Sequence, residues 1–166
     1  MPSRSFIAGI TAAVVGRFLL VQALVWKFGR DIERLNGGDH TALLAAYGDD
    51  FVLHFHEGDH RWAGEWRGRT GMDRFLQNFV RAHIQGEIRS AAISGPPWAM
   101  TLWVRFDDHA DAPDGDRIYE NKTTLVLRTR WGKIVEQRDF YADTAPIVAL
   151  EQKLTELGVA PVPKPE

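Results

Sequence analysis

Apolar residues recur every three or four positions through the first 35 residues, which is the period of one face of an α-helix. The stripe is continuous, and its members are Ile10, Val14, Phe18, Val21, Val25, Phe28, Ile32 and Leu35. We expect the helix to end at Asn36-Gly37-Gly38, because adjacent glycines break helices. Before Lys27 the opposite face is apolar as well, so the first half of this helix is expected to be buried on most sides or to lie against a partner or a membrane.

Residues 6–28 form an apolar stretch as long as a membrane span. Arg17 lies near its middle, where a charge would cost about 2.5–3.5 kcal/mol in a bilayer. Arg17 also interrupts the apolar centre that a cleaved signal peptide needs, and Val25-Trp26-Lys27 is a poor cleavage site. We therefore favour a helix of a soluble, cytoplasmic protein. Peripheral contact of residues 6–28 with a membrane and a cleaved signal are the two alternatives.

The rest of the chain alternates between helix-like and strand-like patterns. The expected elements are a short helix capped by Asp39 and holding Leu43, Leu44 and Tyr47, a strand over 51–56, a loop over 57–69, a helix from Thr70, strands over 87–94, 99–107, 117–130 and 133–141, and a last helix with Pro146 in its first turn. Residues 108–115 are rich in Asp, Pro and Gly and are interpreted as a solvated loop. Trp131-Gly132 is the tight turn of the final hairpin.

This order of elements predicts an α+β fold in which helices pack on one face of a strongly curved, mostly antiparallel sheet. The length suits one domain, which we place at residues 28–158. Residues 1–27 would be a helical extension, and the Pro-rich tail 159–166 is expected to be loose.

Composition excludes several classes of function. The net charge is −2 and no long run of one sign occurs, which argues against a nucleic-acid binder. The chain has no cysteine, so disulfides, thiolate chemistry and cysteine-type zinc sites are excluded.

Three segments resemble a known superfamily. They are residues 35–55, which run from Leu35-Asn-Gly-Gly-Asp-His to Val-Leu-His-Phe, residues 64–72, Gly-Glu-Trp-Arg-Gly-Arg-Thr-Gly-Met, and residues 131–141, Trp-Gly-Lys-Ile-Val-Glu-Gln-Arg-Asp-Phe-Tyr. Together they are similar to the nuclear transport factor 2-like superfamily, which includes ketosteroid isomerase, SnoaL-type polyketide cyclases and limonene epoxide hydrolase. The resemblance covers about residues 28–145 and implies a cone-shaped sheet wrapped around N-terminal helices. It says little about function, because enzymes, binders and scaffolds share the fold.

Asp139 is the first candidate for chemistry. Because side chains alternate along a strand, Asp139 shares a face with Val135, Gln137 and Tyr141. The resemblance to the epoxide hydrolase hairpin implies that this face points into the cone. An acid in an apolar cup has a raised pKa, which suits general acid–base catalysis. The alternative is a structural or surface aspartate.

Arg105 is the expected partner of Asp139, either as an ion pair or as a group that stabilises an oxyanion. The alternative is a solvated arginine at a strand edge. The sequence also departs from the epoxide hydrolase and ketosteroid isomerase patterns. The epoxide hydrolase pattern Arg-x-Asp is replaced by Trp103-x-Arg105, so the second carboxylate of that site is expected to be missing. Its water-positioning Tyr-x-Asn falls on Leu53 and Phe55, and the base of ketosteroid isomerase also falls near Phe55. The expected pocket is lined by Leu53, Phe55, Trp103, Tyr119, Asn121, Gln137 and Tyr141.

Three histidines, His54, His56 and His60, raise a metal-binding hypothesis, because His-x-His on a strand can share a cation. The cupin-like spacing breaks down after His56, and no second motif follows, so structural or loop histidines are favoured. We therefore expect no metal and no cofactor.

The resulting hypothesis is a small-molecule enzyme with an apolar pocket, of the isomerase, cyclase or epoxide-hydrolase type, that uses Asp139 as general acid/base with Arg105 and needs no cofactor. Its partner would be an apolar ligand, and a homodimer is expected because the first helix has more apolar surface than one domain needs. The alternative is a non-catalytic ligand-binding or protein-interaction module on the same fold.

Overall fold

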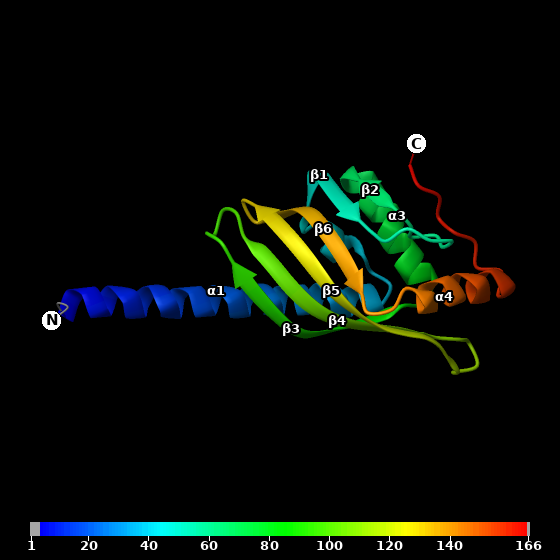
Figure 1. The fold of residues 1–166 in the computed structure, drawn as a ribbon, viewed down its shortest axis with the longest axis horizontal. Coiled ribbons are helices and arrows are strands. Elements are labelled where there is room, and N and C mark those ends of the chain that lie inside the picture. The colour runs from blue at the N-terminus through cyan, green and yellow to red at the C-terminus, as the bar shows by residue number, and fades with distance from the viewer. Residues whose placement is uncertain (1–3, 166) are drawn as a thin grey trace.

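A curled six-stranded sheet forms the body of the protein, with strand order β2-β1-β6-β5-β4-β3 (Figure 1). The computed structural model describes residues 4–165, except for the side chains of residues 4–15, 17 and 18. The strands are β1 (Tyr47–His54), β2 (Glu65–Arg67), β3 (Gln85–Ser94), β4 (Thr101–Asp111), β5 (Arg117–Arg130) and β6 (Lys133–Tyr141). Only the β1–β6 pair is parallel among the described strands, so the expected mostly antiparallel α+β fold is confirmed.

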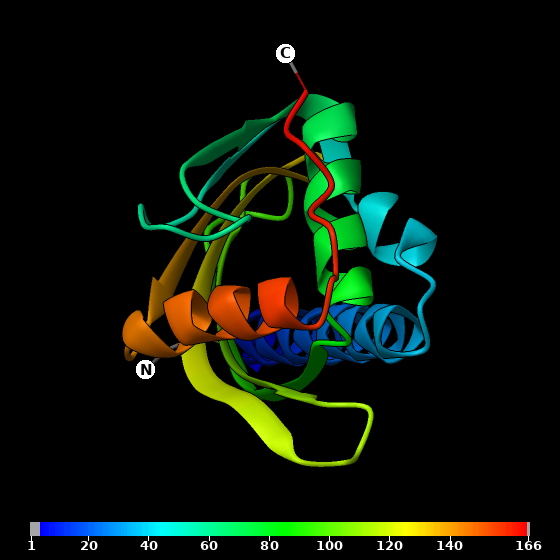
Figure 2. The ribbon, with the colours of Figure 1, turned by 90° about the vertical axis from the view of Figure 1, so that its right-hand side faces the viewer.

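Four helices accompany the sheet: α1 (Arg4–Asn36), α2 (Thr41–Leu44), α3 (Gly68–Arg81) and α4 (Ala145–Glu156). Helix α1 packs on β3, α3 on β1 and β2, and α4 on β5. Seen end-on, the sheet curls around an interior that these helices border, without closing into a barrel (Figure 2).

Alternation along β4 and β5 sends every second side chain into this interior. On β4 the buried residues are Val104, Phe106, Asp108 and Ala110. On β5 they are Tyr119, Asn121, Thr123, Leu125 and Leu127. The concave face is therefore apolar toward the turn between β5 and β6 and polar toward the opposite end of the two strands.

Helix α1 is one continuous helix that ends at Asn36, as the apolar stripe and the two glycines after it predict. Ile32 and Leu35 are buried in the core, whereas the N-terminal part runs well beyond the sheet (Figure 1). Ile10, Val14 and Phe18, which begin the predicted apolar stripe, have side chains outside the described part. Within residues 4–165, no helix combines the length and the apolar character needed to cross a bilayer.

The C-terminal tail, which we expected to be loose, lies against α3 up to the last described residue. Asn78, fully buried in α3, donates its side-chain amide to the Val162 carbonyl (3.0 Å) and accepts the Val162 N–H (2.8 Å). The side-chain amide thus donates and accepts one hydrogen bond each, as a neighbouring β-strand would. The prolines of the tail do not indicate this contact in the sequence. Glu166 lies outside the described residues.

Several predicted boundaries differ from the structure. The short helix ends at Leu44 and β1 begins at Tyr47, because Tyr47 packs edge-on against Phe51 inside the sheet. A short strand, β2, lies within the predicted loop 57–69. The most consequential difference is in β4, which runs to Asp111 instead of ending at Asp107.

Two glycines offer a matched test of packing. Gly86 in β3 lies under the ring of buried Phe106, and an added Cβ would lie 2.0 Å from the ring Cζ. Gly29 in α1 has nothing within 4 Å of such an atom. We predict that Gly86→Ala lowers the free energy of unfolding by about 1–3 kcal/mol, whereas Gly29→Ala raises it by about 0.5–1 kcal/mol. Denaturant titration measures both, and a neutral Gly86→Ala would contradict the packing described.

Candidate active site

Two carboxyl groups are buried on the concave face of the sheet, Asp108 from β4 and Asp139 from β6. They are 1% and 9% exposed, respectively. Strand β5 lies between their strands, with Asn121 opposite Asp108 and Leu125 opposite Asp139. Both aspartates point inward because they follow the alternation of apolar residues on their strands. The prediction that Asp139 faces the interior is therefore correct.

Two tyrosines supply the hydrogen bonds to Asp108. The Tyr119 hydroxyl donates to Asp108 Oδ2 at 3.1 Å, and the Tyr141 hydroxyl donates to the same oxygen at 3.5 Å. The other oxygen, Asp108 Oδ1, is buried and finds no hydrogen-bond partner among the described residues, and the same holds for Thr123 Oγ1. Buried polar atoms without partners are uncommon and mark places where a water or a ligand can bind.

A second hydrogen-bonded series ends on Asp139. The Tyr47 hydroxyl donates to Gln137 Oε1 at 2.8 Å, and Gln137 Nε2 donates to Asp139 Oδ1, also at 2.8 Å. Tyr47 and Gln137 are both buried. This series fixes the orientation of the Gln137 amide and, through it, the Asp139 carboxyl.

Burial raises the pKa of both carboxyls. For Asp139 it raises the pKa to about 7, with the Gln137 hydrogen bond acting in the opposite direction and the nearby Asp108 charge adding to the rise. For Asp108 burial also raises the pKa to about 7, against the hydrogen bonds from Tyr119 and Tyr141. Because each charge disfavours the other, the two groups lose their protons in successive steps. Near neutral pH the site therefore holds an acid and a base together.

A small chamber of about 40 Å³ lies beside Asp139. Its polar lining comes from Tyr47, Gln137, Asp139 and Tyr141, and the rest is apolar. A volume of this size admits a water molecule. Phe28 of α1 lines both this chamber and a wider groove of about 180 Å³ that opens beside α1. Phe28 thus lies between the chamber and the surface.

The SnoaL-like domain family has a sequence model that matches residues 30–137, which is well over half of the chain. The chain belongs to this family. The predicted resemblance to the nuclear transport factor 2-like superfamily is thereby confirmed.

Solved structures agree on the fold of this SnoaL-like protein. A nuclear transport factor 2-like protein of unknown function from Burkholderia pseudomallei superposes with a TM-score of 0.61 and 19% identity, over 78% of this chain and 95% of that one. SalBIII, an epoxide hydrolase/cyclase-like enzyme of pyran ring formation in the polyether salinomycin, gives 0.57 and 16%, over 74% and 93%. A proposed isomerase from Rhodopseudomonas palustris gives 0.56 and 16%, over 78% and 96%. At these identities the likeness shows the fold alone. Curated proteins include no match to the chain.

Arg105 does not lie where we expected it in this SnoaL-like domain. It is exposed and pairs in register with Thr124, which pairs with the exposed Phe140 on the outer face. Asp139 points to the opposite face, so the predicted Asp139–Arg105 pair is wrong. Trp103 shares the outer face and is 42% exposed, so it does not line the interior. Both errors have one cause: the wrong face of β4 was taken as the inner one. Successive side chains on a strand point to opposite faces, so a shift of one residue exchanges the two faces.

The other predicted pocket residues point inward but differ in their surroundings. Gln137 and Tyr141 line the chamber, and Tyr119 binds Asp108. Leu53 and Phe55 are buried in the core. Asn121 donates to the Asp143 carbonyl at 2.7 Å, which ties β5 to the segment before α4.

Sequence reasoning missed Asp108 and Tyr47. Asp108 was assigned to a solvated loop because the residues after it are rich in Asp, Pro and Gly. The signal that identifies it is the continued alternation of Val104, Phe106, Asp108 and Ala110. Its presence reverses the prediction that a second carboxylate is missing.

The three histidines do not form a metal site with other ligands. No group of three or more His, Cys, Asp or Glu residues among the described residues has the geometry to hold a metal ion. His54 lies 3.3 Å from Glu65. The His56 and His60 rings lie 4.6 Å apart between their centroids, and their buried ring nitrogens find no partner in the described part of the chain.

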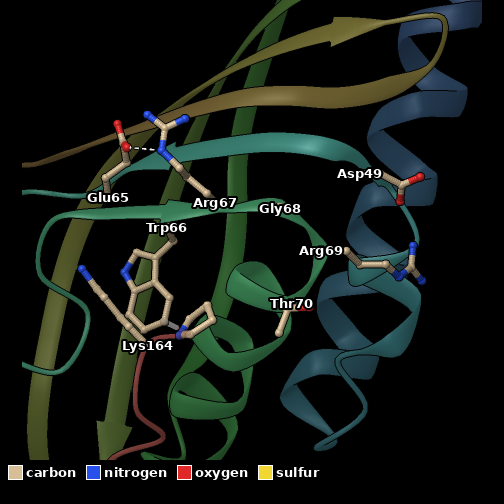
Figure 3. A pocket seen from close by; sticks show the side chains of 9 residues that line it. Asp49, Glu65, Trp66, Arg67, Gly68, Arg69, Thr70 and Lys164 are labelled. Atoms are coloured by element: carbon tan, nitrogen blue, oxygen red, sulfur yellow. Dashed lines mark ion pairs between the residues drawn. The ribbon is translucent and has the colours of Figure 1, made fainter.

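A surface hollow of about 670 Å³ lies elsewhere, at the start of α3 (Figure 3). Glu65 and Arg67 point outward and form an ion pair there, while Lys164 covers the Trp66 ring at 4.8 Å. Its exposed charges, of both signs, contrast with the buried acid pair. Asp108 and Asp139 are therefore the candidate site.

The Asp139 pKa generates a prediction about stability. An aspartate titrates near 3.8 when unperturbed and near 7 in the folded protein, so the folded state keeps a proton that the unfolded state loses. Stability is therefore lost as pH rises from about 4 to 7. We predict that Asp139→Asn matches the wild type near pH 4 and exceeds it by about 4 kcal/mol above pH 7. Denaturant titrations across this range test it, and a pH-independent difference would contradict it.

His60 generates the opposite prediction. Burial and the neighbouring His56 lower the His60 pKa from 6.5 to about 4, so the unfolded state takes up a proton before the folded state does. Stability is therefore lost as pH falls from 6.5 to 4. His60→Leu should reduce this loss by about 1 kcal/mol. Thermal unfolding at several pH values measures it, and an unchanged acid slope would show that His60 is not responsible.

Proposed function

We propose that the protein is a cofactor-independent acid–base enzyme that opens a carbon–oxygen bond, such as that of an epoxide, in an apolar small molecule. The observation that carries this proposal is the pair of buried carboxyls, Asp108 and Asp139, whose pKa values are both raised to about 7. General acid–base catalysis works best when the catalytic pKa lies near the working pH. Asp139 lines a chamber large enough for a water molecule.

One carboxyl acts as acid and the other as base in the proposed reaction. The protonated carboxyl gives its proton to the epoxide oxygen while the carbon–oxygen bond breaks. The ionised carboxyl takes a proton from a water, or from a hydroxyl of the substrate, as that oxygen forms the new bond to carbon. The pair thus ends with its proton exchanged between the two sites, and the net charge is unchanged. Water as nucleophile gives a diol, and an internal hydroxyl gives a cyclic ether.

Assignment of the two roles follows from the hydrogen bonds. Asp139 accepts from Gln137 and borders the chamber, which suits a base that takes a proton from water. Asp108 accepts from Tyr119 and Tyr141 on Oδ2, which leaves Oδ1 to donate a proton. Tyr141 lies between them, because it lines the chamber and contacts Asp108. We therefore propose Asp139 as base and Asp108 as acid.

A ligand-binding module is the second candidate function. The observation in its favour is the groove of about 180 Å³ beside α1, because a ligand can occupy it without reaching Asp108 or Asp139. The catalytic proposal is supported by SalBIII, which is an epoxide hydrolase/cyclase-like enzyme with the same fold.

Turnover of a series of epoxides, from styrene oxide to terpenoid epoxides, distinguishes the two candidates. We predict that Asp139→Asn and Asp108→Asn each lower kcat by about a hundredfold or more while KM changes little. The pH profile of the wild-type kcat should be bell-shaped around neutrality, because an acid and a base must both be in the correct state.

Arg105→Gln is the matched control, because Arg105 is charged, comes from the same strand as Asp108 and points away from it. Its kcat should equal that of the wild type. Binding of the epoxides without turnover, or full activity of both Asn variants, would contradict the catalytic proposal and support the binding module.

A further inference from the structure

The N-terminal part of α1 forms an arm, defined here as residues 4–30, whose first turns extend past the end of the sheet (Figure 1). On one side, Leu20 and Val21 border an apolar groove together with Ile93, Pro97 and Met100. On another side, Leu19 and Trp26 are 60% and 64% exposed. These two residues are seven positions apart, so they share one face of the helix.

Large apolar side chains are exposed mainly at this end of the molecule. Trp98 and Trp131 lie in the two strand turns here, and the Trp131 N–H donates to the Trp98 carbonyl at 2.9 Å. The turn that contains Trp98 also borders the groove beside the arm. An exposed set of Leu and Trp side chains of this kind marks an interaction surface.

The charge of the arm is entirely basic. It contains Arg4, Arg17, Lys27 and Arg30 and no acidic residue. The whole chain has 20 basic and 22 acidic residues, so 16 basic and 22 acidic residues remain outside the arm. Lys27 forms an ion pair with Asp31, directly after the arm, at 2.6 Å. The arm and the body still have opposite net charge, so an anionic surface would attract the arm more strongly than the body.

Arg30 and Trp26 lie together on the exposed face. The Arg30 guanidinium lies 4.9 Å from the centre of the Trp26 ring. Trp beside a basic residue is typical of helices at the boundary between lipid headgroups and acyl chains, where the ring is half immersed and the charge meets phosphate.

We propose that the arm docks the protein on an anionic lipid surface, with α1 lying in the plane of the interface. Leu19 and Trp26 enter the acyl boundary, and Arg30 contacts headgroup phosphates. Arg17, in the middle of the apolar sequence, favours this orientation over a spanning one, because a basic side chain at the interface can extend to the headgroups. A second copy of the arm would instead bring like charges together, which disfavours the arm as its own partner.

Vesicle flotation with the full chain tests the proposal, using phosphatidylcholine vesicles with and without phosphatidylglycerol. We expect binding only to the vesicles with phosphatidylglycerol, weakening as salt is added. Arg17→Gln combined with Arg30→Gln should weaken binding about thirtyfold. Leu19→Ser combined with Trp26→Ser should abolish it, without a change in the circular dichroism spectrum or the melting temperature, because both side chains are exposed.

Phe140→Ser combined with Leu157→Ser is the matched control, because both side chains are exposed and lie away from the arm, Phe140 at the end of β6 opposite the Trp131 turn and Leu157 directly after α4 (Figure 1). This double variant should bind like the wild type. Three results would overturn the proposal: no binding to either kind of vesicle, equal binding to both kinds at all salt concentrations, or undiminished binding of the Leu19/Trp26 variant. A dimer that the Leu19/Trp26 substitutions dissociate, together with absent vesicle binding, would assign the arm to a second copy instead.

Discussion

The burial of two carboxyl groups without a neutralising cation is the constraint on which the site depends. Among the described residues, the side chains that donate hydrogen bonds to Asp108 and Asp139 are all neutral: the hydroxyls of Tyr119 and Tyr141 and the amide of Gln137. Neutral donors offset part of the desolvation cost of a carboxylate, but they do not remove the repulsion between two of them. The two carboxyls therefore keep their protons up to about neutral pH, well above the range in which an exposed aspartate ionises. The curled sheet creates this situation, because its concave face brings inward-pointing residues of β4 and β6 together across β5.

Much of this arrangement could be predicted from the sequence, and the part that failed has a specific physical cause. Tight Gly turns and apolar alternation were enough to identify the final hairpin, and the resemblance to the epoxide hydrolase hairpin implied the inward direction of Asp139. The positions of Asp108 and Arg105 could be predicted only by knowing where β4 ends and which of its faces is buried. A shift of one residue along the strand exchanges the two faces, so a small error misplaces both side chains. The polar residues 107–111 hide the end of the strand, although Phe106 and Ala110 keep the alternation. The chamber volume and the Tyr47–Gln137 hydrogen bond arise from tertiary packing and leave no mark in local sequence.

Helix α1 connects the interior to the surface. Its C-terminal turns bury Ile32 and Leu35 in the core, Phe28 lies between the chamber and the outer groove, and the turns before Phe28 carry the exposed Leu19 and Trp26. One rigid element therefore contacts the core, the entrance and the exposed apolar end. A displacement of α1 at its N-terminal end would be transmitted to Phe28, because a continuous helix moves as a unit.

The two buried carboxyls have an energetic cost that bears on the choice between catalysis and passive binding. A buried carboxyl with an oxygen that lacks a hydrogen-bond partner destabilises the fold, and apolar residues of similar size commonly stabilise such positions. A domain that only bound an apolar ligand would gain stability from Leu or Met at positions 108 and 139. The surrounding aromatic residues could close over such side chains without rearrangement, because the chamber is already small and largely apolar. The acid pair is thus a cost that binding does not require, whereas proton transfer does require it.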